Sequence, residues 1–433
     1  TNTLSVDNLS IAFNCIIENA NGGAGNDILT GNSVANKLVG NAGNDVIYGG
    51  GGDDYLFGGV GDDYLFGDYG NDNLIGDTGA DRIDGGAGSD TVSYANSASA
   101  VSVNLALTTA QTGGDAQGDT LFSIENIIGS AFNDTLTALA TGSTLNGGAG
   151  NDRLNGGAGS NTLIGGTGAD TMSGGAGSDT VSYVASTAAV NVNLALTTAQ
   201  TGGHAAGDIL SGIENIIGSA FADTLTALAT GSTLNGGAGN DKLNGGTGND
   251  TLIGGTGADT INGGAGNDLI SYATSGAAVN VNLGLTTAQS GGDAAGDLLS
   301  NIENLTGSGF NDTLLGTSIA NIIAGGGGKD TMTGGTGADV FKYSRVADSG
   351  AVAGVRDIVT DFTNGTDKID LGDFSGTFVF KGTGAFTHTA HEVNYAQVSG
   401  NTILGIDADG NGILDFQIEL AGLHTMAASD FLL

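Results

Sequence analysis

Single aliphatic residues recur every nine positions along much of this chain, each within a run of glycine and acidic residues. Residues 147–182 divide into GGAGNDRLN, GGAGSNTLI, GGTGADTMS and GGAGSDTVS. Glycine holds places one, two and four, aspartate holds place six in three copies, and Leu, Met or Val holds place eight. Places one to six therefore predict a tight turn, and places seven to nine predict a short strand whose eighth side chain points opposite to its neighbours.

The nonamers form four blocks separated by three inserts. GGAGSDTVSY starts at 85 and again at 174, so a block and its insert repeat after 89 residues. We divide the chain into an N-terminal strand or linker (1–21), blocks (22–93, 129–182, 218–271 and 307–342), inserts (94–128, 183–217 and 272–306) and a C-terminal region (343–433). One copy in each block is degenerate, at 31–39, 138–146, 227–235 and 316–324.

The inserts have a pattern of their own. The segment AVSVNLAL alternates apolar Val101, Val103, Leu105 and Leu107 with smaller or polar residues, as a half-buried strand does. Each insert ends in IEN, whose glutamate lies nine residues before the next repeat aspartate. We therefore expect the glutamates to occupy the aspartate place of the preceding turn, so that the coils continue through the inserts.

Two nonamers make one coil of turn, strand, turn and strand, and successive coils are expected to stack as parallel strands about 4.8 Å apart. One buried aliphatic side chain contributes roughly 1.5–3 kcal/mol, which cannot offset about 1–2 kcal/mol of backbone entropy for each of nine residues. Stacked aspartates would also repel one another. A hard divalent cation solves both problems, and calcium accepts six to eight oxygens in flexible geometry, whereas magnesium demands a tighter octahedron.

The composition agrees with a cation ligand. The chain has 46 acidic and 10 basic residues, a formal charge of −36, 82 glycines and no proline. This charge argues against nucleic acid or an anionic membrane as partner, and no apolar run approaches the ~20 residues of a membrane span. Collagen is excluded because the period is nine rather than three. Disorder is expected only without cation, because the apolar residues recur in register. Cys15 reads as a small buried hydrophobe.

The pattern G-G-x-G-x-D-x-U-x resembles the RTX calcium-binding repeat, with 24 copies in register and the aspartate in 19 of them. This resemblance covers 22–342 and implies an all-β, right-handed parallel β-roll or solenoid with calcium between turns two nonamers apart, about 16 ions or more in total. It implies the following calcium ligands: Asp27, Asp45, Asp54, Asp63, Asp72, Asp81, Asp90, Asp134, Asp152, Asn161, Asp170, Asp179, Asp223, Asp241, Asp250, Asp259, Asp268, Asp312, Asp330 and Asp339. Further candidate ligands are Glu18, Glu125, Glu214 and Glu303. Phe132, Phe221 and Phe310 replace the fourth glycine at each re-entry turn, so these three turns depart from the family pattern.

The last 91 residues differ from the repeats, since they contain seven of the fifteen phenylalanines, and we expect a β-rich cap. RDIVTDFTNGTDKIDLGDF and the final DFLL resemble the C-terminal region of serralysin-type proteins, which implies closure of the β-roll and an uncleaved type I secretion signal. LSIAFNCIIENANGGAGND resembles the segment that joins the protease domain to the repeats in that family. DADGNGILD, with Asp407, Asp409, Asn411 and Asp415, is spaced like the start of an EF-hand loop, although Ile418 stands where the bidentate glutamate belongs. A polar turn is the alternative.

We predict no catalytic site. HEVNYA at 391–396 lacks the second histidine of the zinc-peptidase motif H-E-x-x-H, and the four histidines (204, 388, 391 and 424) form no recognisable arrangement. A lyase or epimerase would need acidic, Tyr, Lys or His side chains clustered on one strand face, where Thr, Asn and Ser predominate. In the first block Tyr48, Tyr64 and Phe66 fall on one outward face and Tyr55 and Phe57 on the other. This aromatic face predicts docking of a neighbouring domain or a glycan, or else packing of the first coils.

We expect a secreted protein, extracellular or at the cell surface, that passes a type I exporter unfolded and folds in high calcium. Three roles stay open. The chain is the repeat and secretion part of a serralysin-like metallopeptidase with its catalytic domain upstream, a self-assembling structural protein of a surface layer or matrix, or a glycan-binding adhesin.

Overall fold

The computed structural model describes residues 8–10, 18–374, 376–387, 389 and 391–433. Cys15 and His388 lie outside the described residues. The chain divides into two compact units, Thr1–Ile217 and Gly218–Leu433. Among the described residues the only helices are three-residue 3-10 turns, and none has the length and hydropathy needed to cross a membrane.

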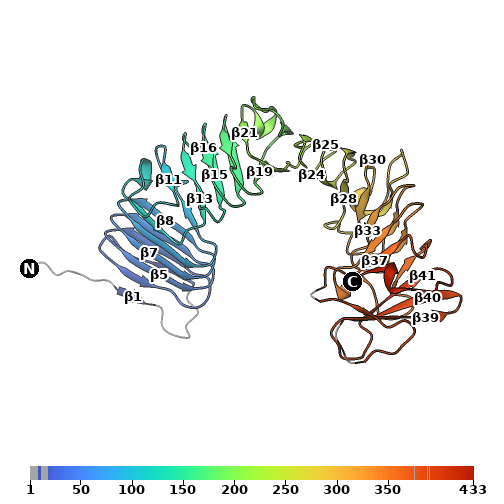
Figure 1. Ribbon diagram of the computed structural model, residues 1–433. Coiled ribbons are helices and arrows are strands. Elements are labelled where there is room, and N and C mark those ends of the chain that lie inside the picture. Colours follow the sequence, from blue (N-terminus) through green and yellow to red (C-terminus); the bar gives the residue numbers. More distant parts are fainter. Residues whose placement is uncertain (1–7, 11–17, 375, 388, 390) are drawn as a thin grey trace, which may run out of the picture. The chain divides into compact units, whose positions relative to one another are not determined.

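In the first unit successive nonamers alternate between two parallel sheets, so that strands pair with a step of 18 residues (Figure 1). One sheet has the order β1 (Asn8–Ser10), β3 (Ile28–Thr30), β5 (Val46–Gly51), β7 (Tyr64–Tyr69), β9 (Arg82–Ala87) and β12 (Thr120–Phe122). The opposite strands are β2 (Asn19–Asn21), β4 (Lys37–Ala42), β6 (Tyr55–Val60), β8 (Asn73–Thr78), β10 (Thr91–Ser93), β13 (Asn126–Ile128), β15 (Thr144–Ala149), β17 (Thr162–Thr167), β19 (Thr180–Ser182) and β22 (Asn215–Ile217). The predicted coil of two nonamers is confirmed.

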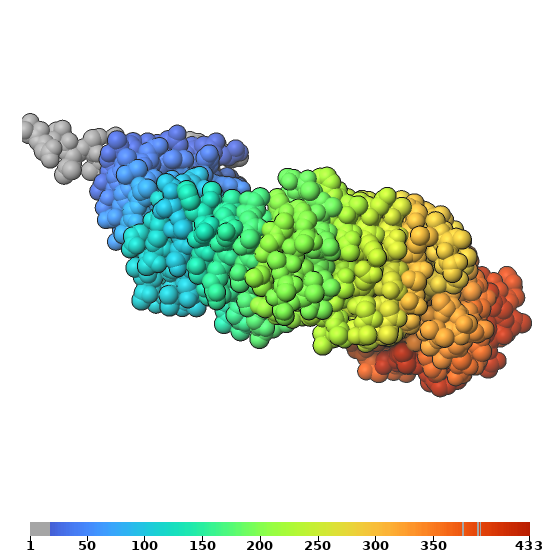
Figure 2. Space-filling model, turned by 90° about the horizontal axis from the view of Figure 1, so that it is seen from above, coloured from blue at the N-terminus to red at the C-terminus, as the bar shows by residue number. Residues whose placement is uncertain are grey.

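Each insert keeps one sheet intact and interrupts the other. The strand β13 of the first insert pairs with β10 before it and β15 after it. On the other face β12 ends the first sheet, and β11 (Ser102–Asn104) begins a new one with β14 (Thr135–Thr137), β16 (Arg153–Asn155), β18 (Thr171–Ser173) and β21 (Ile209–Ser211). The 3-10 turns η1 (Gly114–Ala116) and η2 (Gly203–Ala205), and β20 (Asn191–Asn193), complete the unit. The space-filling view shows the coils of this unit following one another in chain order, from blue to green (Figure 2).

The second unit repeats the plan. One face has β23 (Thr224–Thr226), β25 (Lys242–Thr247), β27 (Thr260–Ala265) and β30 (Leu298–Ser300), and the opposite face has β24 (Thr233–Ala238), β26 (Thr251–Thr256), β28 (Leu269–Ser271), β31 (Asn304–Thr306), β33 (Ile322–Ala324), β35 (Val340–Lys342), β37 (Lys368–Asp370) and β42 (Phe431–Leu432). A third sheet has the order β29 (Asn280–Asn282), β32 (Thr313–Leu315), β34 (Thr331–Thr333), β36 (Asp357–Val359), β41 (Phe416–Leu420), β40 (Asn401–Asp407), β39 (Glu392–Val398) and β38 (Val379–Phe380). The turns are η3 (Gly292–Ala294), η4 (Val346–Asp348) and η5 (Ala428–Asp430). Because β39, β40 and β41 pair antiparallel, the C-terminal region is β-rich, as predicted.

The place-eight side chains form the core. Leu29, Leu38, Ile47, Leu56 and Leu65 are all 0% exposed, which confirms the inward direction that the pattern predicts. Several strands are longer than predicted. For example, β5 continues through place three of the next nonamer, because Gly50 and Gly51 still pair with Asp68 and Tyr69 of the next coil.

The predicted insert strand is shorter in the structure. Val101, Val103 and Leu105 are buried, but Leu107 is 45% exposed. The chain turns there, since the Leu107 N–H donates to the Asn104 carbonyl at 3.1 Å. The alternation therefore holds for three of the four apolar positions.

Candidate metal sites between stacked coils

The place-six carboxylates form ladders that run from coil to coil. The backbone N–H of Asp27 donates to Oδ1 of Asp45 at 2.7 Å, and the N–H of Asp45 donates in turn to Oδ1 of Asp63 at 2.7 Å. The second face repeats this geometry, with the N–H of Asp54 at 2.7 Å from Oδ1 of Asp72. One oxygen of each carboxylate thus holds the preceding coil in register.

The other oxygen of most place-six aspartates is buried without a hydrogen-bond partner. This holds for Oδ2 of Asp45, Asp54, Asp63, Asp72, Asp81, Asp90, Asp152, Asp170, Asp179, Asp241, Asp250, Asp259, Asp268, Asp330 and Asp339. Fifteen of the twenty predicted ligands therefore present an unsatisfied carboxylate oxygen. Buried polar atoms are rarely left in this state, so these atoms require a partner.

Glycine at place one makes room beside each unsatisfied oxygen. A methyl group added to Gly40 would lie 2.2 Å from Oδ2 of Asp45 and 2.6 Å from the carbonyl oxygen of Gly58, one coil further on. The same arrangement recurs at Gly49, between Asp54 and Gly67. A carboxylate oxygen and a carbonyl oxygen from two stacked coils thus converge on the space that a side chain would fill.

Burial strongly affects the ionisation of these groups. Desolvation, followed by the charges of neighbouring aspartates, raises the pKa of Asp54, Asp63 and Asp152 to about 7 and that of Asp81 to about 8. The hydrogen bond from the preceding coil opposes this shift in each case. A buried carboxylate in such surroundings takes up either a proton or a cation. An all-oxygen set of carboxylates and carbonyls is one that calcium prefers, so the residues present fit that ion.

Five predicted ligands differ from this pattern. The second oxygen of Asp27 accepts the N–H of Gly23 at 2.5 Å. At the re-entry turns Asp134, Asp223 and Asp312 accept hydrogen bonds from both the N–H and the hydroxyl of a serine, namely Ser130, Ser219 and Ser308. The amide of Asn161 accepts from Ser143 and donates to Gly159 and Asp179. The neighbouring Phe132, Phe221 and Phe310 are 44%, 43% and 46% exposed.

The insert glutamates take the place that their spacing predicts. Oε2 of Glu125 accepts the N–H of Asp90 at 2.8 Å, and Glu214 and Glu303 accept those of Asp179 and Asp268 at 2.9 Å each. Each glutamate therefore adds one carboxylate to a ladder within the insert, and its own N–H donates to the backbone carbonyl of Asp90, Asp179 or Asp268. Glu18 is exposed, and its carbonyl accepts the N–H of Lys37 at 2.6 Å.

Five further aspartates belong to the ladders, although the nonamer pattern does not predict them. Oδ1 of Asp119, Asp208 and Asp297 accepts the N–H of Asp81, Asp170 and Asp259, at 2.8, 2.9 and 2.9 Å. Asp357 and Asp367 do the same for Asp330 and Asp339 at 2.8 and 3.0 Å, so the ladders continue beyond residue 342. All five lie two residues before a buried Leu, Val or Ile. This Asp-x-aliphatic spacing could have identified them without the glycines.

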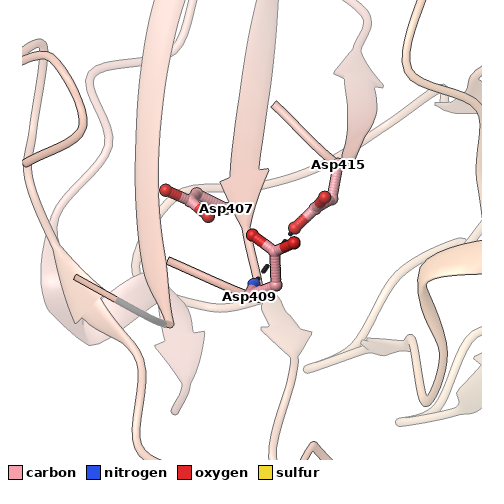
Figure 3. A group of neighbouring side chains, drawn as sticks. All are labelled: Asp407, Asp409 and Asp415. Atoms are coloured by element: carbon pink, nitrogen blue, oxygen red, sulfur yellow. Dashed lines mark hydrogen bonds between the residues drawn. The ribbon is translucent and has the colours of Figure 1, made fainter. Parts of the chain in front are cut away.

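The C-terminal acidic turn does bring three of its predicted residues together. Carboxylate oxygens of Asp407, Asp409 and Asp415 lie within 4.8 Å of one another (Figure 3). Oδ2 of Asp415 accepts the N–H of Ala408 at 2.6 Å, and Asp407 accepts those of Gly410 and Gly412 at 2.8 and 2.9 Å. Asn411 donates to Asp409 and accepts from Ile413. These bonds also suit the alternative, a polar turn.

The three described histidines contact different residues. His391 packs edge-on against Phe378 at 5.1 Å. Nδ1 of His424 lies 2.9 Å from Oδ1 of Asn364, and its Nε2 lies 3.0 Å from the carbonyl oxygen of Ala421. His204 sits in the 3-10 turn η2 of the second insert.

Comparison with known proteins identifies two regions. The RTX calcium-binding nonapeptide repeat matches residues 17–33, 30–65, 66–96, 128–163, 146–181 and 235–270, and the peptidase M10 serralysin C-terminal family matches residues 294–433. Neither match covers a catalytic domain. No curated protein matched the sequence. Among solved structures, the extracellular lipase LipA from Serratia marcescens is 16% identical, with a TM-score of 0.15. That match covers 71% of this chain and 39% of the lipase chain. The chain is thus a parallel β-roll. It carries RTX-type nonapeptide repeats in the matched segments between residues 17 and 270 and a serralysin-type C-terminal region over residues 294–433.

Proposed function

We propose that the place-six aspartates hold calcium ions between stacked coils and that calcium binding drives folding after export. The observation that carries this proposal is the set of fifteen buried carboxylate oxygens without a partner. Calcium bound there would neutralise the ladders and join adjacent coils through oxygens of both. Without it, the place-six aspartates either remain protonated or repel one another, because the chain has only 10 basic residues. The interior turn pairs of the repeats give about 16 ions or more.

Folding then depends on the compartment. In a cytosol with little free calcium the chain stays unfolded and can enter an exporter, and outside the cell the binding free energy becomes folding free energy. Circular dichroism of the full chain in EGTA at pH 9, where the ladder aspartates are deprotonated, followed by addition of calcium or magnesium, tests this coupling. We expect β-structure only with calcium. A folded spectrum in EGTA, or equal folding with magnesium, contradicts the proposal.

We further propose that residues 343–433 direct the chain to a type I exporter, as the serralysin-type match of residues 294–433 supports. The role is then that of the repeat and secretion part of a serralysin-like protein. Expression beside a type I exporter, with and without the last four residues, tests it. We expect the intact chain in the medium and the shortened chain in the cells. Equal secretion of both chains would count against a signal at this end.

A further inference from the structure

The first block carries a cluster of exposed aromatic side chains on its strands, whereas each later block exposes one phenylalanine (Phe132, Phe221 or Phe310) at its re-entry turn. Tyr64 is 48% exposed and Tyr69 is 73% exposed, both on β7. Tyr48 of β5 stacks on Phe66 of β7 with ring centroids 5.0 Å apart and ring planes 10° apart. The corresponding outward positions of the later sheets, such as Thr137, Asn155 and Ser173, hold small polar residues. The calcium ladders face the interior and do not require these rings.

The stack of the Tyr48 and Phe66 rings is not continued on the next strand, where a hollow lies instead. Tyr48, Phe66 and Asp84 are in register on three successive strands, so Asp84 stands where a third ring would stack. A hollow of about 370 Å³ opens at this point, lined by Phe66, Asp68, Tyr69, Asp84, Gly86 and Ala87. One face of an aromatic ring and two carboxylates therefore border the same space.

Asp68 occupies a backbone position that favours glycine. Its φ is 71°, whereas its register partners Gly50 and Gly86 have φ of 100°. The left-handed region is unfavourable for most residues and less so for Asp or Asn. Partial burial, together with the charge of Asp84, raises the pKa of Asp68. Asn41 and Asp77 take the same left-handed conformation at place two of their own nonamers, so the backbone alone does not distinguish Asp68. Its position beside Phe66 and Tyr69 in the hollow does.

We propose that this hollow binds a neutral oligosaccharide, with one sugar ring stacked on Phe66 in place of the missing third ring. A pyranose presents a C–H face to an aromatic ring, and its hydroxyls donate hydrogen bonds to carboxylates such as Asp68 and Asp84. The open sheet surface lets the rest of the glycan extend past Tyr69.

Charge selects among the possible ligands. The formal charge of −36 disfavours acidic glycans. A basic peptide is disfavoured because Asp84 already has an ion-pair partner, with Nη2 of Arg82 3.4 Å from its Oδ2. The Arg82 guanidinium also lies 4.0 Å from the Phe122 ring centroid. Sugar hydroxyls can still bond to a carboxylate that has an ion-pair partner, since each carboxylate oxygen accepts more than one hydrogen bond.

Calorimetric titration of the full chain in calcium tests the site with cellohexaose, maltohexaose and mannohexaose, and with alginate and oligolysine as acidic and basic probes. At least one neutral hexasaccharide should bind. Asp68→Gly and Asp84→Asn should each weaken that binding by about tenfold or more, since each removes a hydrogen bond to a charged acceptor. Tyr55→Ser, on the opposite face at 54% exposure, is the matched control and should leave binding unchanged.

Asp68→Gly should retain the fold, because the residues paired with Asp68 on the neighbouring strands, Gly50 and Gly86, are already glycines. Circular dichroism in calcium verifies that point. A loss of binding in this variant can therefore be assigned to the missing carboxylate. The proposal is overturned if none of the three neutral hexasaccharides binds, if Asp68→Gly and Asp84→Asn bind as the parent does, or if only oligolysine or alginate binds.

Discussion

The hydroxyl of Tyr94 donates a hydrogen bond of 3.0 Å to Oδ2 of Asp119, the carboxylate that ends the first ladder on its face. Tyr183 and Asp208 repeat this contact at 3.0 Å, and Tyr272 and Asp297 at 2.8 Å. In all three inserts a buried tyrosine thus supplies the partner that the ladder aspartates of the blocks lack. The inserts therefore end a ladder without leaving an unpaired carboxylate oxygen.

Removing one of these hydroxyls should destabilise the folded chain. Tyr94→Phe leaves Oδ2 of Asp119 buried without a donor, which costs about 1–3 kcal/mol. We expect a lower urea midpoint in saturating calcium. Tyr55→Phe is the control, because Tyr55 is 54% exposed and should tolerate the change. Equal midpoints for Tyr94→Phe and the parent would show that the hydroxyl does not stabilise the insert.

The repeat blocks could be predicted almost entirely from the sequence, because each nonamer contains its own turn glycines, its core residue and its acid. The step of 18 residues, the inward place eight and the insert glutamates all followed from spacing. The inserts could be predicted only in part. Val101 and Val103 read as a strand, but the turn GGDAQGD that precedes Leu121 does not have the glycine spacing of a nonamer. The partner of Asp119, Tyr94, is 25 residues away in the chain. A contact of that kind depends on tertiary folding and leaves no local pattern.

The site residues show the same division. Oδ2 of Asp45 is unpaired as a ligand should be, but Ser130 saturates Asp134, and nothing in the aspartate itself distinguishes the two. The difference arises at place two, where Ser130 replaces a glycine and brings a hydroxyl to the carboxylate. A comparison of place two across the nonamers could have detected it.

Two adjacent aspartates should behave oppositely when neutralised. Asp63 is buried in the ladder with Oδ2 unpaired, whereas Asp62 is exposed and its Oδ1 accepts the N–H of Ala80 at 3.0 Å. Asp63→Asn should reduce the number of bound calcium ions in calorimetric titration, and Asp62→Asn should retain the parent number. Asp63→Asn should also stabilise the calcium-free chain, because it removes a charge from a desolvated position. Unchanged stoichiometry in Asp63→Asn would exclude this carboxylate as a ligand.

A methyl group at place one should close a candidate site. In Gly40→Ala the new Cβ would lie 2.2 Å from Oδ2 of Asp45, too close without a shift of the carboxylate. We expect weaker calcium binding and a lower thermal midpoint in calcium. Gly25→Ala is the matched control in the preceding coil, because no atom lies within 4 Å of the added carbon. If calcium binding and the thermal midpoint fell equally in both variants, the effect would come from replacing any turn glycine and not from closing the site.

Stability without calcium should decrease as pH rises. Desolvation raises the pKa of Asp54 and Asp63 to about 7, and that of Asp81 and Asp357 to about 8, from ordinary values near 3.8. The folded chain therefore holds more protons than the unfolded chain between these limits. The stabilisation is fully present below about pH 4 and is lost as pH rises through 7 to 8.

Circular dichroism of the metal-stripped chain between pH 5 and 9 measures this loss, and it should show more β-structure at the acidic end. In the presence of calcium the pH dependence should be the opposite, with folding favoured at higher pH, because the ion binds only deprotonated carboxylates. The calcium concentration at half-folding should therefore rise as pH falls from 8 to 6. Asp62→Asn should follow the parent curve, since Asp62 lies outside the buried ladder. A metal-stripped chain whose β-structure ignores pH would mean that protons and calcium do not compete for these buried oxygens.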